Sequence, residues 1–505
     1  MRVALLVAAG VALRCSVALG QPAGGVPRYS PREAETTLAQ VHAAVVTFHP
    51  RAYEPGGRAA IDTAFERAGE RLAALAGPRG DDSVARALVV ATIADAARVL
   101  GDGHFQLRYL PRPAVEARYR YDLATARLDD GRLVLRDSLY VADSATLYSP
   151  GVEVFAIDGR PVGPLIELLS RGGGLDDHDM ARARAEPPSR YPLRYYQRAF
   201  GWRDSLSVAL GPYRGRPADT AWLYPRSFPP EAPPRARRRR GTRRRSRAAR
   251  LADNLRLDTT RLPGVYELDI RTFSRGRFRG VNEFKAVNRA FARLEAEDAR
   301  ALVIDVRGNT GGQLSLVSRV FAHVADGAYR TYDDVVAYHP RARGRTWRER
   351  ALRYVFGGVR ERDGVYVQRR GRRSPRVREP SRRHRFRGPV VVLVNEVSFS
   401  GATLLAHLVQ QAQRGVVVGQ PPGGSAERMY ASVLFPIPVG RDGELTVNMP
   451  LWRMDMPGET RGNVVPDVIV PRRLADVRDG RDAALEIGLG LIERWLRLAP
   501  GATPD

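Results

Sequence analysis

Two hydroxyl side chains, Ser398 and Ser400, lie where the sequence changes from a strand pattern to a helix pattern. Before them, the apolar run Val390–Val394 is typical of a strand buried on both faces. After them, Ala402–Leu408 has the apolar spacing of a helix packed on a sheet. Open α/β sheets place their sites at this edge, and a helix N-terminus stabilises anions, so we expect a serine here to be exposed and able to attack. The pattern also fits a serine that only caps the helix.

A second strand pattern, Ala301–Val306, ends in a glycine-rich loop, Arg307–Gly312. Glycine lets backbone N–H groups approach a substrate closely. Acyl transfer by a serine needs donors for the oxyanion, and we expect the N–H groups of Gly401, Gly311 and Gly312 to supply them. The loop alone also fits an ordinary strand–helix turn or a phosphate cradle. It lacks the pattern G-x-x-x-x-G-K-S/T, which argues against a nucleotide site.

A serine nucleophile also needs a base, and the chain has eight histidines. Only His104 lies in a glycine-flanked turn, between a helix pattern and a strand pattern. A lone histidine in such a turn fits a structural role as well as a general base. The others lie in or beside helix patterns, or in loops, and fit structural roles: His42, His49, His178, His323, His339, His384 and His407.

Five short motifs, in this order along the chain, resemble those of the C-terminal-processing (tail-specific) serine peptidases and their tricorn-core relatives. The first is the D-G-H turn in Gly101–His104, and the second is D-x-R-G-N-x-G-G at Asp305–Gly312. The third is V-N-x-x-S-x-S at Val394–Ser400. V-G-x-x-x-G-G at Val418–Gly424 and G-x-x-x-P-D at Gly462–Asp467 complete the set. The resemblance covers roughly the last half of the chain and implies a ClpP/crotonase-like α/β peptidase core.

One departure from this family concerns its lysine. The processing peptidases use a serine–lysine dyad, whose lysine lies in the glycine loop after the nucleophile's helix. Alignment of the motifs puts Ser425 at that position, where it is either a secondary hydrogen-bonding residue or a loop serine. The only lysine of the chain, Lys285, lies on another element. The resemblance therefore excludes a serine–lysine mechanism for this chain.

The tricorn-like branch of the family instead uses histidine, serine and glutamate. Its pattern implies that Ser400 is the nucleophile and His104 the general base. Glu459 is the best match to the glutamate, which orients or tunes the site. Where the tricorn pattern carries a serine before the histidine, this chain has Gly103.

Periodicity and composition predict a multidomain α+β chain. Alternating strands and helices in the last half predict a largely parallel sheet with crossover connections. In the middle of the chain, Gly151–Val162 and the helix pattern Pro164–Leu169 resemble part of a PDZ-like module, a fold that binds peptide chain ends. The expected parts are a signal peptide (1–20), an N-terminal helical module (21–108), a PDZ-like β-rich module (109–216), a Pro/Arg-rich linker (217–261), the serine peptidase core (262–475), and a C-terminal helix and tail (476–505).

The N-terminus predicts export to the periplasm or the extracellular space. Met1-Arg2 and the apolar stretch Val3–Leu13 resemble a secretory signal, and Ala18–Gly20 offers small residues for cleavage. Arg14 interrupts the stretch, so the signal is either removed or kept as a short anchor. After removal the chain has no cysteine, because Cys15 is the only one, and it then holds no disulfide, thiol nucleophile or cysteine-ligated metal.

The formal net charge of +26 raises the question of nucleic-acid binding. Because all but one of the 81 basic residues are arginine, the charge indicates a composition bias. The densest run, Arg235–Arg250, has no interleaved aromatic residues and fits a solvated linker. We expect no nucleic-acid partner, and at most nonspecific contact of this run with acidic polymers or a membrane surface.

These observations predict an exported serine peptidase that hydrolyses peptide or protein substrates through an acyl-enzyme, with no metal or cofactor. Two alternatives remain. The first is a non-catalytic ligand- or peptide-binding protein on the same core, as in the retinoid-binding relatives of this fold. The second is an acyl-CoA enzyme, because the core resembles the crotonase fold, but export removes the chain from the usual acyl-CoA pool.

Overall fold

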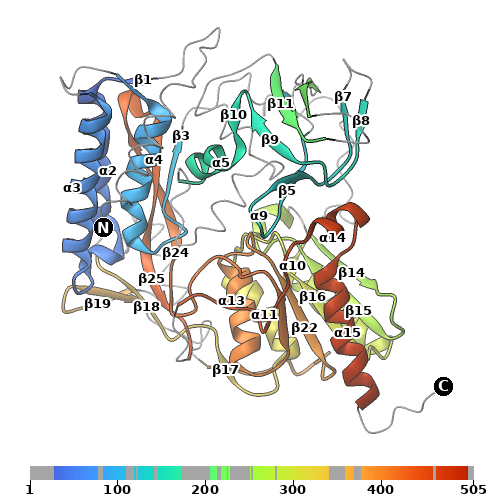
Figure 1. The fold of residues 1–505 in the computed structure, drawn as a ribbon. Coiled ribbons are helices and arrows are strands. Elements are labelled where there is room, and N and C mark those ends of the chain that lie inside the picture. Colours follow the sequence, from blue (N-terminus) through green and yellow to red (C-terminus); the bar gives the residue numbers. More distant parts are fainter. Residues whose placement is uncertain are drawn as a thin grey trace, which may run out of the picture.

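The chain folds into a mixed α/β structure (Figure 1). The signal segment, the Arg235–Arg250 run, His178 and Glu459 lie outside the described part. The computed structural model describes residues 28–77, 83–109, 119–120, 123–141, 146–171, 205–212, 218–223, 226–227, 251, 254–278, 281–339, 359–368, 377–458 and 462–498.

The N-terminal part consists of three packed helices, α2 (Pro31–Phe48), α3 (Gly57–Leu75) and α4 (Arg86–Ala97). The start of α2 is set by a capping box, in which the side chains of Ser30 and Glu33 each accept the other residue's backbone N–H. Short 3-10 turns follow two of the helices: η1 (Pro50–Tyr53) after α2 and η2 (Arg98–Leu100) after α4.

A long hairpin from the C-terminal half completes the core of these helices. It consists of β24 (Arg428–Val439) and β25 (Leu445–Asp455), which are longer than the strands that the sequence pattern predicts, Ser432–Ile437 and Leu445–Pro450. The strand β3 (Gln106–Tyr109), which follows α4 and η2, pairs antiparallel with β25. Apolar side chains of the hairpin, including Val439 and Val447, belong to the same buried cluster as the helices. This pairing joins the N-terminal part to the C-terminal half.

The hairpin belongs to a mainly antiparallel sheet, and a separate six-stranded sheet forms the core of the C-terminal half. In that core sheet the first two strands are antiparallel and the others are parallel, as their alternation with helices predicts. The first sheet has the order β19 (Val359–Arg362), β20 (Val365–Gln368), β18 (Asp334–Ala337), β25, β24. The core sheet has the order β14 (Leu255–Thr259), β15 (Val265–Ile270), β16 (Ala301–Asp305), β22 (Val390–Val394), β23 (Val416–Gly419), β26 (Val468–Ile469).

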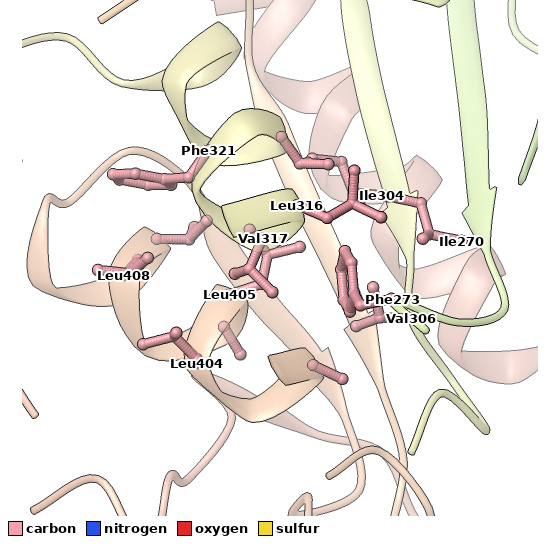
Figure 2. Packing of buried hydrophobic residues seen from close by; sticks show 14 of the residues in the cluster. Ile270, Phe273, Ile304, Val306, Leu316, Val317, Phe321, Leu404, Leu405 and Leu408 are labelled. Atoms are coloured by element: carbon pink, nitrogen blue, oxygen red, sulfur yellow. The ribbon is translucent and has the colours of Figure 1, made fainter. Parts of the chain in front are cut away.

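Both faces of the core sheet are covered, which explains the continuous apolar character of its strands. Leu302 and Ile304 point to one face and Ala301 and Val303 to the other, because side chains alternate along a strand. Figure 2 shows Ile304 beside apolar side chains of the covering helices, among them Val317 and Leu405. The helices on that face are α10 (Glu283–Ala296), α11 (Leu314–Val324) and α13 (Gly401–Gln411), and α15 (Ala483–Leu498) covers the other (Figure 1).

A β-rich part follows the N-terminal helices in the chain and lies above the core in Figure 1. Its four-stranded sheet and the helix α5 (Val162–Arg171) enclose a buried cluster of their own, which also includes Ala87 of α4. The guanidinium of Arg472 ties this part to the core: it donates to the carbonyl of Arg127 at 2.8 Å and to Glu396 at 3.2 Å. The strand order is β10 (Arg160–Pro161), β9 (Val154–Ile157), β11 (Leu206–Leu210), β12 (Asp219–Leu223). None of the helices within the described ranges is long and apolar enough to cross a bilayer.

Candidate active site

The turn between β22 and α13 holds the two serines in different roles. Ser398 is fully buried, and its hydroxyl donates to the carbonyl of Val306 at 2.8 Å. The same oxygen accepts the N–H of Asn395 at 3.0 Å. Ser398 therefore closes the turn and joins it to the neighbouring strand. Its hydroxyl is a structural hydrogen-bonding group.

Ser400 occupies the N-cap position of α13, but its side chain makes no capping hydrogen bond. Its backbone is strained, because residues other than glycine rarely adopt its torsion angles, φ 56° and ψ −111°. The expectation of an exposed serine is wrong, because only 8% of Ser400 is accessible. Met429 covers it, with its sulfur 3.5 Å from Ser400 Oγ, and His104 approaches from another side.

His104 reaches the serine from the N-terminal part of the chain. Its Nε2 lies 3.1 Å from Ser400 Oγ, within hydrogen-bond distance. The turn that carries it begins after η2, where Gly101 adopts a left-handed conformation, and continues into β3, which β25 holds. The imidazole packs against the ring of Phe399, with 4.6 Å between ring centroids. The structure thus brings together the two residues that the sequence motifs singled out.

Asp102 supports His104 from behind and was not assigned a role from the sequence. Its Oδ1 lies 3.4 Å from His104 Nδ1 and accepts the backbone N–H of His104 at 2.7 Å. Its Oδ2 accepts the N–H of Phe105 at 2.9 Å and lies 3.1 Å from His49 Nε2. The signal in the sequence was its place in the D-G-H motif, two residues before the histidine.

The carboxyl group of Asp102 is ionised in this setting. Burial alone would raise its pKa, but the hydrogen bonds and charges of His104 and His49 outweigh burial and lower the pKa to about 2. A buried carboxylate beside Nδ1 favours the tautomer in which Nδ1 carries the proton. Nε2 is then free to accept a proton from the serine hydroxyl.

The glycine-rich loop lies against the serine turn. A Cβ atom on Gly311 would lie 2.7 Å from the Cβ of Ser400, and one on Gly401 would lie 3.4 Å from the nitrogen of Gly312. The N–H of Gly311 is already used, since it donates to Asn309 Oδ1 at 2.8 Å. Within the described residues, the N–H groups of Gly312 and Gly401 have no hydrogen-bond partner. Backbone bonds of Phe273 to the carbonyl of Gly311 and the N–H of Gln313 hold the loop in place.

The remaining sequence candidates make structural contacts or lie elsewhere. Ser425 Oγ donates to the carbonyl of Gly462 at 3.1 Å and accepts the N–H of Glu427 at 3.0 Å, as a loop serine would. Lys285 lies in the first turn of α10. Glu459 is outside the described residues.

Other histidines of the described chain are engaged away from the serine. His323 bonds to Asn288 and to the carbonyl of His384, and burial lowers its pKa to about 4. His407 contacts the carbonyl of Pro457 at 2.6 Å, and burial lowers its pKa as well. Among the residues that the structure describes, no group of three or more His, Cys, Asp or Glu is arranged to hold a metal ion.

Comparison with known proteins identifies relatives of the core and of the fold. The family model of peptidase family S41 matches residues 266–469, a stretch that includes Ser400 and the glycine-rich loop but not His104. The structure is similar to that of mature CPAF, with a TM-score of 0.59 and 13% sequence identity over 94% of this chain and 99% of that chain. The structure is also similar to that of mature CPAF complexed with lactacystin, with a TM-score of 0.59 and 14% sequence identity over 93% of this chain and 99% of that chain. No curated protein matches the chain by sequence.

At these identities the structural likeness concerns the fold, and the family match concerns the sequence of the core. Both agree with the order of the core motifs along the chain. Residues 266–469 thus match peptidase family S41, the C-terminal-processing peptidases, and the findings support a serine-type peptidase.

Proposed function

We propose that this peptidase hydrolyses peptide bonds through an acyl-enzyme, with Ser400 as nucleophile and His104 as general base. The observation that carries the proposal is the 3.1 Å distance between His104 Nε2 and Ser400 Oγ. A base must lie within hydrogen-bond reach of the proton that it removes, and this distance satisfies that condition. The strained backbone of Ser400 supports the proposal, because strain of this kind clusters at functional sites.

The reaction uses these groups in two half-reactions. Nε2 of His104 takes the hydroxyl proton as Ser400 Oγ bonds to the peptide carbonyl carbon, and the carbonyl oxygen becomes an oxyanion. The N–H groups of Gly401 and Gly312 donate to that oxyanion, while the lack of a side chain at Gly311 lets the loop lie directly against the serine turn. The C–N bond then breaks, and His104 gives its proton to the leaving amine. A water molecule, deprotonated by the same imidazole, releases the second product from the acyl-enzyme.

Asp102 is the carboxylate that orients the imidazole in this proposal. It is buried and ionised, and it lies next to Nδ1 of His104. It therefore stabilises the imidazolium that forms when Nε2 accepts the serine proton. The orienting role of Glu459 rests on the resemblance to the tricorn-like branch, and in that case two carboxylates act on one site.

The remaining parts of the proposal concern the chain outside the core. We infer that the β-rich part is PDZ-like and binds the end of a substrate chain, while the N-terminal helical module carries the base to the serine. The apolar N-terminus directs export to the periplasm or beyond, and the Arg235–Arg250 run contacts acidic polymers without specificity. The substrate is a peptide or a protein.

Labelling with a fluorophosphonate probe tests the catalytic residues without knowledge of the substrate. The probe reacts only with an activated serine, so wild type should be labelled, and Ser400→Ala and His104→Ala should not. Ser425→Ala is the matched control, because the hydroxyl of this serine bonds to backbone groups of Gly462 and Glu427, and the variant should label as wild type does. Labelling that survives Ser400→Ala would identify another nucleophile. A folded wild type that does not react would favour a non-catalytic binding protein.

A further inference from the structure

His49 is a buried histidine that the reaction described above does not use. None of its surface is exposed, and it lies at the junction of α2 and η1. Its Nδ1 accepts the backbone N–H of Arg51 at 3.1 Å, which caps η1. A ring nitrogen that accepts a hydrogen bond carries no proton, so in the neutral imidazole the proton lies on Nε2. This nitrogen lies 3.1 Å from Asp102 Oδ2 and is therefore the donor in that contact.

This contact adds His49 to the series of contacting side chains Ser400, His104 and Asp102. Asp102 has His104 Nδ1 at one oxygen and His49 Nε2 at the other. Both contacts lie in the buried interior, since the side chain of Asp102 is 1% exposed and that of His49 is fully buried. Hydrogen bonds to a buried charge are among the strongest in a protein, and each fixes the rotamer of the carboxylate.

The ring of His49 is itself held on its other sides. The ring of Tyr430, from β24, packs against it with 4.9 Å between centroids. The hydroxyl of Tyr430 donates to Glu54 Oε1 at 3.0 Å, and Glu54 accepts a further bond from the guanidinium of Arg51 at 2.9 Å. These titratable and charged groups, with Asp102, surround the imidazole from the turn after α2, from β24 and from the D-G-H turn. The ring is therefore held at both nitrogens and against the ring of Tyr430.

We propose that His49 is a positioning residue of the active site, whose Nε2–H holds Asp102 in the rotamer and ionisation state that orient His104. The inference rests on the proposed roles of Ser400 and His104. A purely structural role needs only the Nδ1 acceptor that caps η1. A positioning role needs the Nε2 donor as well, so the two roles predict different outcomes for two substitutions.

His49→Asn and His49→Gln separate the two nitrogens. The asparagine oxygen lies near the place of Nδ1 and keeps the cap, but the side chain is too short to donate to Asp102. Glutamine is longer, and its amide nitrogen reaches the place of Nε2. We expect His49→Asn to slow fluorophosphonate labelling about 10- to 100-fold, as loss of a hydrogen bond to a charged group does. His49→Gln should stay within about threefold of wild type.

The pH profile of the labelling rate gives a readout that a structural role would not change. Without the hydrogen bond from His49, the negative charge of the Asp102 carboxylate is less stabilised, and this charge then favours the protonated form of His104 more strongly. The acidic limb of the profile should therefore move to higher pH in His49→Asn and stay in place in His49→Gln. A limb that stays in place in His49→Asn, or moves the other way, overturns the proposal, as do equal rates in the two variants.

Two further measurements keep the result interpretable. Wild type and Ser400→Ala are labelled in parallel, so a failure of the proposed catalytic roles appears in wild type and is distinct from a failure of His49. If His49→Asn does not fold, the wild-type protein with 15N-labelled histidine gives the answer at pH 7. We expect the His49 ring to show a protonated Nε2 and an unprotonated Nδ1, and the reverse tautomer would overturn the proposal.

Discussion

Gly311 and Ser400 are so close that a Cβ atom on the glycine would lie 2.7 Å from the Cβ of the serine. Real Cβ atoms do not approach other heavy atoms this closely. The same added atom would lie 2.7 Å from the nitrogen of Gly401, one of the proposed oxyanion donors. The lack of a side chain at Gly311 therefore lets the glycine-rich loop pack directly against the turn that carries the nucleophile and an oxyanion donor.

Gly311→Ala should abolish fluorophosphonate labelling, because the methyl group displaces the serine turn or closes the space beside it. The backbone of Gly311 has φ +89°, so alanine is also strained there. We expect the free energy of unfolding to fall by about 2–5 kcal/mol, the sum of overpacking and of the left-handed conformation. Labelling rate and thermal unfolding measure the two effects separately.

Gly308→Ala is the matched control in the same loop. Gly308 also has a positive φ, +70°, but a Cβ there would meet nothing within 4 Å. We therefore expect a loss of stability of about 1–2 kcal/mol from backbone strain alone, with the labelling rate near that of wild type. Equal loss of labelling in the two variants would mean that backbone strain, and not proximity to Ser400, explains the effect at Gly311.

The sequence predicts the core sheet well, because its strands carry a strong signal. Ala301–Asp305 and Val390–Val394 are continuous apolar runs, and such runs have few alternatives to a strand covered on both faces. The same holds for the parallel arrangement, which follows from the alternation with helices. The family resemblance, carried by motifs at the ends of these strands, is confirmed by the match of residues 266–469.

The support of the site was not predictable, because it depends on contacts between distant segments. His104 and Ser400 are 296 positions apart, and they meet where β3 pairs with β25 and the hairpin packs on the N-terminal helices. In the sequence, Asp102 cannot be distinguished from an aspartate that only stabilises a turn by accepting nearby backbone N–H groups. Asp102 does accept such bonds, from the N–H groups of His104 and Phe105. The burial of Ser400 depends on Met429, whose strand is longer than its pattern indicated.

Asp102→Asn should impair catalysis much more than folding. An asparagine can donate to Nδ1 of His104, which favours the tautomer whose Nε2 carries the proton and cannot accept one from Ser400. We expect the labelling rate to fall by about 10³- to 10⁴-fold, the size of the effect known for a triad carboxylate. If Glu459 alone orients the imidazole, the rate will change by less than about tenfold. Glu459→Gln, labelled beside it, shows which carboxylate carries the role.

The same carboxylate makes stability depend on pH in a defined window. The pKa of Asp102 is lowered from 3.8 to about 2 in the folded state, because bonds from His104 and His49 outweigh the cost of burial. A lowered pKa contributes stability that is complete above the unfolded value, near pH 4, and is lost as the pH falls through the folded value. The contribution is about 2 kcal/mol. Urea unfolding at a series of pH values from 5 to 2 measures it.

The comparison for this measurement is Asp102→Asn, which has no charge to lose. The difference in unfolding free energy between wild type and the variant should be constant above pH 4 and shrink by about 2 kcal/mol on the way to pH 2. A difference that does not change across this window would show that Asp102 is not preferentially ionised in the folded protein.

Ser398→Ala should destabilise the protein, although Ser398 is not the proposed nucleophile. The substitution leaves the N–H of Asn395 without its partner and removes one of two donors to the carbonyl of Val306, at a position that is fully buried. We expect a loss of about 1–3 kcal/mol in the free energy of unfolding, with labelling retained below the melting temperature. Complete loss of labelling from a variant that remains folded would reassign the nucleophile.

Substitution of Ser400 itself by glycine or alanine separates its strain from its chemistry. Both variants lose the hydroxyl and neither should be labelled. Alanine keeps the unfavourable backbone at φ 56° and ψ −111°, whereas glycine adopts it freely. Relief of strain is worth about 1–3 kcal/mol, and the greater entropy of an unfolded glycine opposes it by about 0.5–1 kcal/mol. Ser400→Gly should therefore unfold with a free energy about 1 kcal/mol higher than Ser400→Ala. The reverse order would mean that the serine backbone is unstrained in solution, and the strain would then no longer support Ser400 as a functional residue.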